Sequence, residues 1–265
     1  MAEDKSTRLN KFLALELGIS RRAADELITG GKVTIDDTVA DLGARVYPDS
    51  VVKVNGTSVK KDATLIYLAF NKPVGHVCSR RAQGDNPTIY VLLPSKYHAL
   101  KPVGRLDKDS SGLILLTNDG DFAHRMTHPS FHKVKIYEVQ LDKPLEPLHQ
   151  QMISDYGITL EDGKSQFIVE RVEEPLATSS GETSATPTNP VAYTRNVGRE
   201  AVSPDDGGEK ANTVYRITMN EGRNRQIRRT FAALGYTVTY LHRTQFGNYR
   251  IDGLKPGNFR ITTPQ

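Results

Sequence analysis

Apolar positions recur at helical spacing near the start of the chain. In RLNKFLALELG the large apolar side chains fall on one helix face: Leu9, Phe12, Leu13 and Leu17. Gly18 is suited to end this helix, and Ser20 is a suitable N-cap for a second one, RRAADELITGG. The short segments KVTID and VVKVNG then predict strands joined by tight turns. Residues 6–60 are therefore predicted to form a small module of two helices and a few strands.

From residue 67 onward the pattern predicts a larger, strand-rich domain that extends to residue 265. KVKIYEVQL (133–141) alternates as a strand does, and a strand is also predicted at 113–117. FNKPVGHVCS predicts a strand ended by a sharp turn. The segment 175–212 is rich in Ser, Thr, Pro and Gly and is predicted to be a flexible polar insertion. We therefore expect an α+β protein of two domains.

Composition narrows the protein class. The chain has 265 residues with 37% hydrophobic and 25% charged residues, which is typical of a globular protein. It has no apolar run of bilayer length, and its first residues lack the apolar core of a secretory signal. No membrane partner is therefore expected. A single cysteine, Cys78, excludes an intrachain disulfide and favours a reducing, cytoplasmic setting. A monomer is the default expectation.

The charge of the chain is mildly positive but unevenly distributed. The net charge is +4, whereas residues 215–260 contain nine basic residues against two acidic ones. Arg21 and Arg22 also occupy the first turn of a predicted helix, where the helix dipole disfavours cations. They are either solvated surface side chains or part of an anion site. The surplus near the C-terminal end favours a polyanionic partner.

The motif GRLDKDSSG (104–112) places an arginine two residues before an aspartate. In an extended segment Arg105 and Asp107 would point to the same side. A guanidinium beside a carboxylate favours its charged form, as a nucleophile requires, although a structural ion pair would look the same. Gly112 is expected to let the chain turn tightly before the strand at 113–117.

A cationic helix is predicted at 221–236. Its apolar face consists of Ile227, Phe231 and Leu234, and Gly235 is suited to end it. Its basic face consists of Arg225, Arg228 and Arg229. Like charges at this spacing destabilise a helix by roughly 0.2–0.5 kcal/mol per pair, and no acid follows to compensate. Binding of phosphates or of a carboxylate explains this pattern better than a purely structural helix does.

The N-terminal module resembles the S4 RNA-binding domain. The resemblance rests on RLNKFLALELGISRRAADELITGGKVTID followed by VKVNG. It implies an αα-β fold that binds structured RNA. The resemblance also implies an RNA-facing set of basic residues: Arg8, Lys11, Arg21, Arg22 and Lys32.

Four segments of the larger domain, in order, resemble the pseudouridine synthases of the RsuA type, which also carry an N-terminal S4 domain. The segments are LAFNKPVGHVCS, PVGRLDKDSSGLILLTNDGD, KIYEVQL and NEGRNRQIRRTFAALGYTV. The resemblance implies a mixed, mainly antiparallel sheet and a catalytic aspartate at Asp107. It implies that Arg105 pairs with this aspartate, that Arg228 forms a second salt bridge to it, and that Tyr137 stacks on the uracil. The remaining basic residues of the segment would contact the RNA: Arg223, Arg225 and Arg229.

The implied reaction is the isomerisation of uridine to pseudouridine in ribosomal RNA, free or within an assembling subunit. This reaction needs no cofactor, and the sequence contains neither GxxxxGK[ST] nor GxGxxG. His124, His128 and His132 are spaced by four, but Pro129 breaks any helix that would align them as metal ligands, so no metal is expected. DKDSSGL and GRNRQIRR favour large-subunit (23S) RNA as the target.

Two other functions are compatible with parts of the sequence. A non-catalytic RNA-binding or assembly protein would retain the S4 module but would have lost Asp107 or its arginine, and both are present. A carboxylate-dependent glycoside-cleaving enzyme needs a second acid near Asp107, which Asp109, Asp119 or Asp121 could supply. That second function gives no account of the S4 module or of the arginine-rich helix.

Overall fold

The computed structural model describes residues 6–80, 84–172 and 213–265. The N-terminal module contains two helices, α1 (Leu9–Glu16) and α2 (Arg21–Thr29), beside small antiparallel sheets. Four strands form one sheet in the order β3-β2-β5-β6, and two others pair separately as β1-β4. The bounds of these strands are β1 Thr7–Arg8, β2 Val33–Ile35, β3 Thr38–Val39, β4 Arg45–Val46, β5 Val52–Val54 and β6 Thr57–Ser58. The αα-β expectation is confirmed.

The two helices of this module form where the apolar spacing and the cap predicted them. Leu9 and Leu13 are fully buried, whereas Leu17 follows the helix and is 40% exposed. The Ser20 hydroxyl accepts a 3.0 Å hydrogen bond from the amide of Ala23, which is the predicted N-cap. The small core is therefore built by side chains whose positions follow from the sequence alone.

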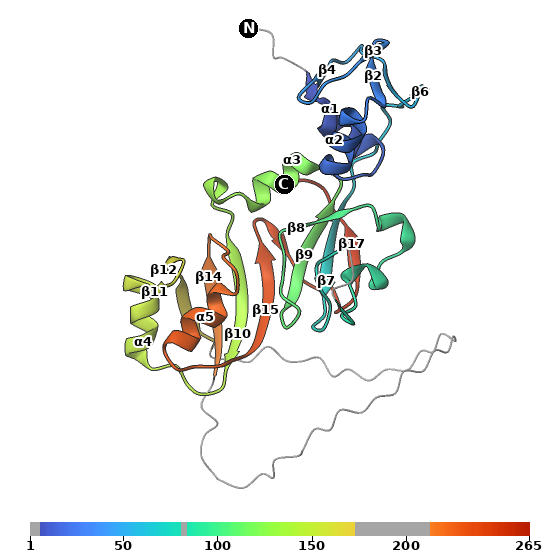
Figure 1. Ribbon diagram of the computed structural model, residues 1–265. Coiled ribbons are helices and arrows are strands. Elements are labelled where there is room, and N and C mark those ends of the chain that lie inside the picture. The colour runs from blue at the N-terminus through green and yellow to red at the C-terminus, as the bar shows by residue number, and fades with distance from the viewer. Residues whose placement is uncertain (1–5, 81–83, 173–212) are drawn as a thin grey trace, which may run out of the picture.

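The larger domain is built on a nine-stranded sheet with the main order β13-β14-β10-β15-β9-β7-β17, to which β16 adds beside β15 and β8 beside β9 (Figure 1). β15 and β9 run parallel, while the other paired strands of this sheet run antiparallel. The mixed, mainly antiparallel sheet is thus confirmed. The strands are β7 Tyr67–Lys72, β8 Lys101–Val103, β9 Ser111–Thr117, β10 Lys135–Leu141, β13 Ile168–Arg171, β14 Val214–Met219, β15 Val238–Phe246, β16 Tyr249–Arg250 and β17 Phe259–Ile261.

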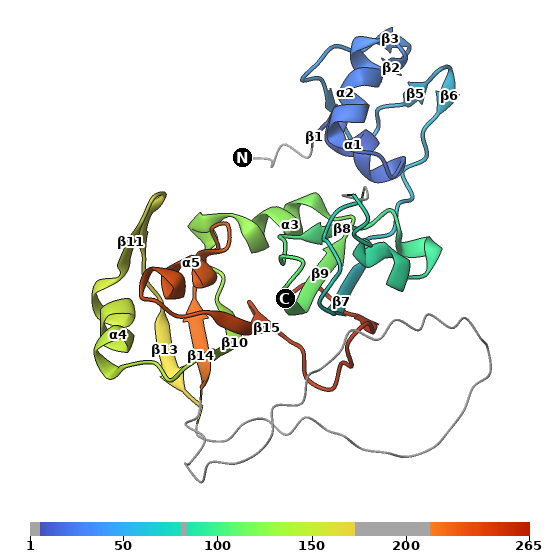
Figure 2. The ribbon, with the colours of Figure 1, turned by 60° about the horizontal axis from the view of Figure 1, so that its bottom comes forward.

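Helices and one hairpin complete this domain. The helices are α3 Gly120–Thr127, α4 Pro147–Gln151, which continues as a π-helix over Met152–Tyr156, and α5 Gln226–Ala233. The hairpin pairs β11 (Ile158–Leu160) with β12 (Gly163–Ser165). Short 3₁₀ helices occupy Ile89–Leu92, Ser95–Tyr97 and Pro129–Phe131. Figure 2 shows α3 and α5 in different parts of the domain, with α3 toward the N-terminal module.

Both faces of β9 are covered, so every residue of this strand is buried. Leu113 and Leu115 pack with Phe122 and Met126 of α3. Ile114 and Leu116 instead belong to the larger core, which includes Ile227 and Phe231 of α5. A continuous apolar run is what a strand between two cores requires. The apolar face predicted for the cationic helix is confirmed by the same core.

Gly112 does not make the expected turn. It lies inside β9 with φ +108°, paired with Arg243 of β15. A Cβ at this position would lie 2.3 Å from the carbonyl oxygen of Arg243 and 2.4 Å from its nitrogen. Glycine is needed here because two backbones approach closely, so the sequence-based explanation of Gly112 was wrong.

The N-terminal module is joined to the larger domain next to α3 (Figure 1). The Glu16 carboxylate accepts hydrogen bonds from the amides of Asp62 and Ala63, at 3.1 and 2.9 Å, and so fastens the connector to α1. The predicted insertion 175–212 lies outside the described residues. In the part of the chain that is described, no helix has the length and hydrophobicity needed to span a membrane.

Candidate active site

A pocket of about 540 Å³ opens where the loop before β9 meets the segment that precedes α5. Asp107 lies in that loop, and Tyr137 reaches the same pocket from β10. Leu241, Arg243 and Phe246 of β15 line it as well. The structure therefore brings together the two residues that the family resemblance marked as catalytic aspartate and active-site tyrosine.

The loop that carries Asp107 is held in place by hydrogen bonds from a buried lysine. Lys72 is fully buried at the end of β7, and its ammonium donates to the carbonyls of Ser110 at 2.6 Å and Asp107 at 3.0 Å. It also donates to the carbonyl of Pro73 at 3.1 Å. Burial lowers the pKa of Lys72, and the nearby Asp107 and Asp109 oppose this shift. The sequence indicated only a turn at this motif, so the role of Lys72 was missed.

Arg105 does not pair with Asp107. The segment between β8 and β9 is a loop, so the geometry of an extended strand does not apply to it. Arg105 is exposed and lines the pocket beside Asp107, but it makes no ion pair with any described residue. The predicted ion pair between these neighbours is therefore corrected.

Arg225 supplies the cation near Asp107 instead. Its guanidinium lies 3.7 Å from the Asp107 carboxylate and 3.6 Å from that of Asp109. Arg225 is the N-cap of α5 and has a left-handed backbone with φ +46°. It therefore lies outside the helix that was predicted to include it, and this conformation directs its side chain into the pocket rather than along the helix.

Arg228 also differs from the expectation. Its guanidinium donates to the carbonyls of Val238 at 2.8 Å and Asp109 at 3.0 Å, and no ion pair to Asp107 forms. Burial and the nearby Arg225 lower the pKa of Arg228. Arg228 thus joins the loop of Asp109 to the start of β15. The second salt bridge predicted for it is replaced by backbone contacts.

Arg243 is a buried cation in the pocket wall that the sequence analysis did not single out. Its Nε donates to the Leu113 carbonyl at 2.8 Å, and its guanidinium lies 4.7 Å from the centre of the Phe246 ring. Its Nη2 atom is buried without a partner among the described residues. Arg243 pairs with Tyr137 across β10 and β15. In the sequence, the burial of this cation could have been inferred from the position of an arginine within the strand-like segment VTYLHRTQF.

Lys135 lines the pocket two residues before Tyr137. Its ammonium donates to the carbonyls of Lys133 and Asn220, both at 3.2 Å, and lies 5.5 Å from the Phe246 ring centre. Burial, assisted by Arg243 and opposed by Glu221, lowers the pKa of Lys135 to about 8. The protonation state of this residue can therefore change close to physiological pH.

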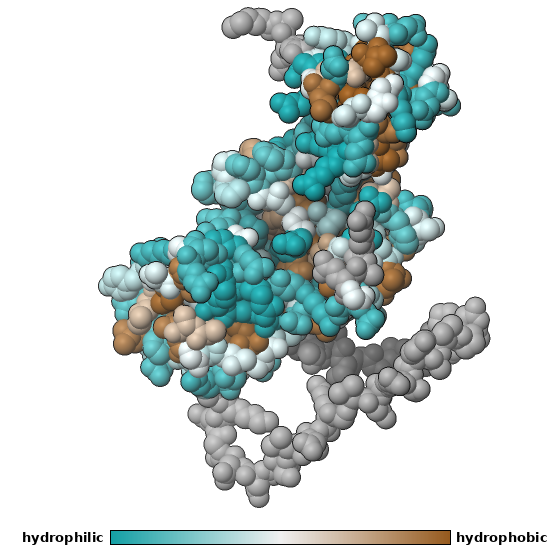
Figure 3. Space-filling view, in the orientation of Figure 1, coloured by the Kyte–Doolittle hydropathy of each residue, from teal (hydrophilic) through white to brown (hydrophobic). Residues whose placement is uncertain are grey.

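Two arginines predicted to bind RNA are paired with an aspartate. Asp162, in the β11–β12 turn, forms ion pairs with Arg223 and Arg229, with nitrogen–oxygen distances of 3.0 and 2.7 Å. Arg223 also donates to the carbonyls of Gly163 and Lys164. The compensating acid that is missing near α5 in the sequence thus comes from a distant hairpin. Figure 3 shows hydrophilic residues gathered on this face over α5.

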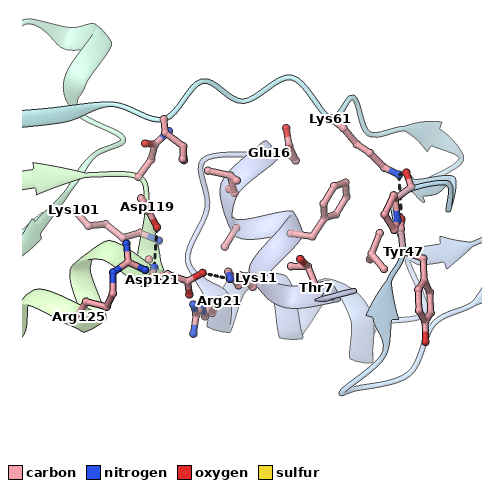
Figure 4. Close-up of a pocket in the computed structure, with 18 residues that line it drawn as sticks. Thr7, Lys11, Glu16, Arg21, Tyr47, Lys61, Lys101, Asp119, Asp121 and Arg125 are labelled. Carbon is pink, nitrogen blue, oxygen red and sulfur yellow. Dashed lines mark hydrogen bonds and ion pairs between the residues drawn. The ribbon is translucent and has the colours of Figure 1, made fainter. Parts of the chain in front are cut away.

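The basic residues predicted for the S4 module separate into two groups. Arg8, Arg21, Arg22 and Lys32 are exposed, although the Arg21 guanidinium reaches Gly120 of the larger domain. Lys11 instead is half-buried and forms an ion pair with Asp121 of the larger domain (Figure 4). Not all of the predicted RNA face is therefore presented to solvent.

The three histidines of HRMTHPSFH do not form a shared site. The rings of His124 and His128 are 4.8 Å apart, and Phe131 packs against both. Within the described ranges, no three histidine, cysteine, aspartate or glutamate side chains come together as metal ligands. Cys78 is buried and its thiol donates to the Leu106 carbonyl at 3.3 Å, which fits a packing role.

Comparison with known families agrees with this fold. A model described as RNA pseudouridylate synthase matches residues 66–233, and a model of the S4 domain matches residues 7–52. The chain therefore belongs to the RNA pseudouridylate synthase family and is a pseudouridine synthase with an N-terminal S4 domain.

Relatives align over almost the whole chain. The ribosomal small subunit pseudouridine synthase A of Yersinia pestis is 33% identical over 97% of this chain and 95% of its own length. The protein of the same name from Escherichia coli K12 is 32% identical over 97% of each chain. An uncharacterized RNA pseudouridine synthase of Mycobacterium tuberculosis H37Rv is 34% identical over 97% of this chain and 90% of its own. A crystal structure of a pseudouridylate synthase superposes with TM-score 0.59 at 27% identity, covering 97% of this chain and 96% of the other.

Proposed function

We propose that this protein converts a specific uridine of ribosomal RNA to pseudouridine, with Asp107 as the catalytic carboxylate. One observation carries the assignment: Asp107 reaches the pocket lined by Tyr137, with the Arg225 guanidinium 3.7 Å from its carboxylate. The guanidinium complements the charge of the carboxylate, and the aromatic ring offers a surface on which a flipped base can stack.

The proposed roles follow the atoms of the reaction. The N1–C1′ bond of uridine breaks, the base rotates, and a C5–C1′ bond forms. C5 then loses a proton while N1 gains one, so the conversion is an isomerisation. In this proposal Asp107 assists at the sugar or base, and Tyr137 is the candidate acceptor of the C5 proton. The uridine must leave its stack to enter the pocket, which costs a few kcal/mol.

We further propose small-subunit (16S) RNA as the target. The relatives from Yersinia and Escherichia are both named as small-subunit enzymes. The preference for large-subunit RNA that DKDSSGL and GRNRQIRR suggested has no support among these relatives. The substrate is either free RNA or an assembling subunit. Activity on each of the two can be compared in parallel reactions.

The test is a modification map. Wild type and Asp107→Asn are expressed in a host lacking the enzyme, and both ribosomal RNAs are sequenced after carbodiimide treatment, which marks pseudouridine. We expect one new site in 16S RNA with wild type and none with the variant. A site in 23S RNA would overturn the target assignment. RNA that both proteins bind and neither modifies would favour the non-catalytic RNA-binding function.

A further inference from the structure

Two polar side chains that line the pocket of Asp107 are buried with an unused hydrogen-bonding group. Ser110 is 1% exposed and Arg243 is 2% exposed, and both line this pocket. The Ser110 hydroxyl and the Arg243 Nη2 atom each lack a hydrogen-bond partner among the described residues. Buried polar groups in folded proteins are nearly always hydrogen-bonded, because leaving one unpaired destabilises the fold. The two groups therefore mark a place where a ligand can supply the missing hydrogen bonds.

Other contacts of the same two residues fix their positions. The Ser110 carbonyl accepts a hydrogen bond from the Lys72 ammonium at 2.6 Å. The Arg243 Nε donates to the Leu113 carbonyl at 2.8 Å, and its guanidinium lies 4.7 Å from the centre of the Phe246 ring. A ligand that binds the free hydroxyl and the free Nη2 atom thus meets groups that are already in place, so little ordering is needed on binding.

The two acids that line this pocket lie beside other arginines. The Asp107 carboxylate is 3.7 Å from the Arg225 guanidinium, and the Glu221 carboxylate is 3.5 Å from that of Arg223. Arg243 forms no ion pair with any residue in the described ranges. The acceptor that completes its hydrogen bonding therefore comes from outside the chain.

A flipped base is the part of an RNA substrate that can reach this place. Tyr137 pairs with Arg243 across β10 and β15, so a base that stacks on the tyrosine ring comes next to the guanidinium. The phosphates stay with the RNA backbone outside, where Arg105 and Arg225 are exposed. Enzymes that flip a base read its Watson–Crick edge by hydrogen bonds and stack its faces against aromatic or apolar side chains.

We propose that Arg243 selects uracil as the base and that Ser110 helps to hold it. The Arg243 Nη2 atom donates to O4 of the base, and the Ser110 hydroxyl accepts from N3–H. Cytosine carries an amino group in place of O4, so two donors would face each other and both would stay unpaired. The Ser110 hydroxyl does not discriminate, because it can accept from N3–H of uracil or donate to N3 of cytosine. This inference deepens the proposed function and rests on its assignment of uridine as the substrate.

Affinities for two RNAs that differ in a single base test this assignment. The proteins are full-length chains carrying Asp107→Asn, so that no reaction occurs, either alone or with Arg243→Met or Ser110→Ala. The probes are ribosomal RNA transcripts with uridine or cytidine at the position that the modification map identifies. We expect the Asp107→Asn parent to bind the uridine RNA about 10-fold more tightly, as one hydrogen bond from a charged donor allows.

The two added substitutions should act differently. Arg243→Met should lose affinity for the uridine RNA alone, so that its two affinities agree within about 2-fold. Ser110→Ala should weaken the binding of both RNAs and keep the preference for uridine. If Arg243→Met does not fold, Arg243→Gln takes its place, because the shorter side chain also withdraws the donor. Thermal melts verify the folding of every variant.

The matched control is Arg260→Met, which removes an exposed arginine that also donates to backbone carbonyls but does not line the pocket. It should keep the preference of the parent. A merely structural role of Arg243 would weaken the binding of both RNAs equally, and that result overturns the proposal, as does a parent without a preference for uridine. Failure of the proposed function is distinguishable, because the modification map would then contain no modified position.

Discussion

The ammonium of Lys72 donates a 3.0 Å hydrogen bond to the backbone carbonyl of Asp107. The lysine is fully buried at the end of β7, and its other carbonyl partners come from the same loop and from Pro73. The position of the Asp107 loop is thus set by a side chain more than thirty residues earlier in the chain.

Replacing Lys72 should affect both stability and catalysis. Lys72→Met leaves buried carbonyls of the Asp107 loop without a donor, and we expect a loss of about 2–4 kcal/mol in the free energy of unfolding. A displaced carboxylate should lower kcat about 100-fold. Urea unfolding and single-turnover assays below the melting temperature measure the two effects. An unchanged kcat in the folded variant would show that the loop is held by other contacts.

A methyl group on Gly112 should disrupt the contact between β9 and β15. Gly112→Ala combines φ +108° with a Cβ 2.3 Å from the Arg243 carbonyl oxygen, and we expect at least about 3 kcal/mol of destabilisation. Gly253→Ala is the matched control, because φ there is +69° and no atom lies within 4 Å of the added Cβ. It should cost only about 1 kcal/mol. Equal losses in urea unfolding would contradict the close-approach explanation.

The pH profile should report Lys135. Its pKa of about 8 means that the ammonium is present in the pocket below that pH and lost above it. We expect kcat/KM to decline with a midpoint near pH 8 in wild type, and this decline to be absent in Lys135→Arg, which stays charged. A decline that persists unchanged in the arginine variant would assign it to another group.

The same shift has a consequence for stability. A lysine in an unfolded chain has a pKa of about 10.4. Between about pH 8 and about pH 10.4, the unfolded chain therefore binds one more proton at Lys135 than the folded chain does. The contribution of Lys135 to stability therefore rises with pH across this window. The difference in the free energy of unfolding between wild type and Lys135→Met, measured by urea unfolding at about pH 7.5 and about pH 9.5, should show this increase.

Arg225 and Arg229 should differ in their effect on catalysis although they are four residues apart. Arg225 is the cation near Asp107, so Arg225→Gln should lower kcat about 100-fold. Arg229 is half-buried on α5 and paired with Asp162 rather than with Asp107, so Arg229→Gln should leave kcat within about 3-fold of wild type. Single-turnover rates at saturating enzyme separate this effect from RNA binding. Equal losses would argue for a shared role of the arginines in binding the RNA backbone.

Much of this protein follows from local sequence. The burial of Leu9 and Leu13, the cap at Ser20 and the apolar face of Ile227 and Phe231 depend on residues within one or two turns of each other. Periodicity and capping record such short-range relationships directly. The order of four motifs likewise indicated the enzyme family, and the resemblance predicted a catalytic role for Asp107.

The partners of the charged side chains were decided only by the tertiary structure. Arg225 rather than Arg105 lies near Asp107, Asp162 neutralises Arg229 from a distant hairpin, and Lys11 pairs with Asp121 across the domain boundary. Long flexible side chains can reach several partners, and the choice depends on where segments 60 to 120 residues apart are brought together. Sequence spacing carries no record of that distance, whereas the folded sheet and its loops determine it.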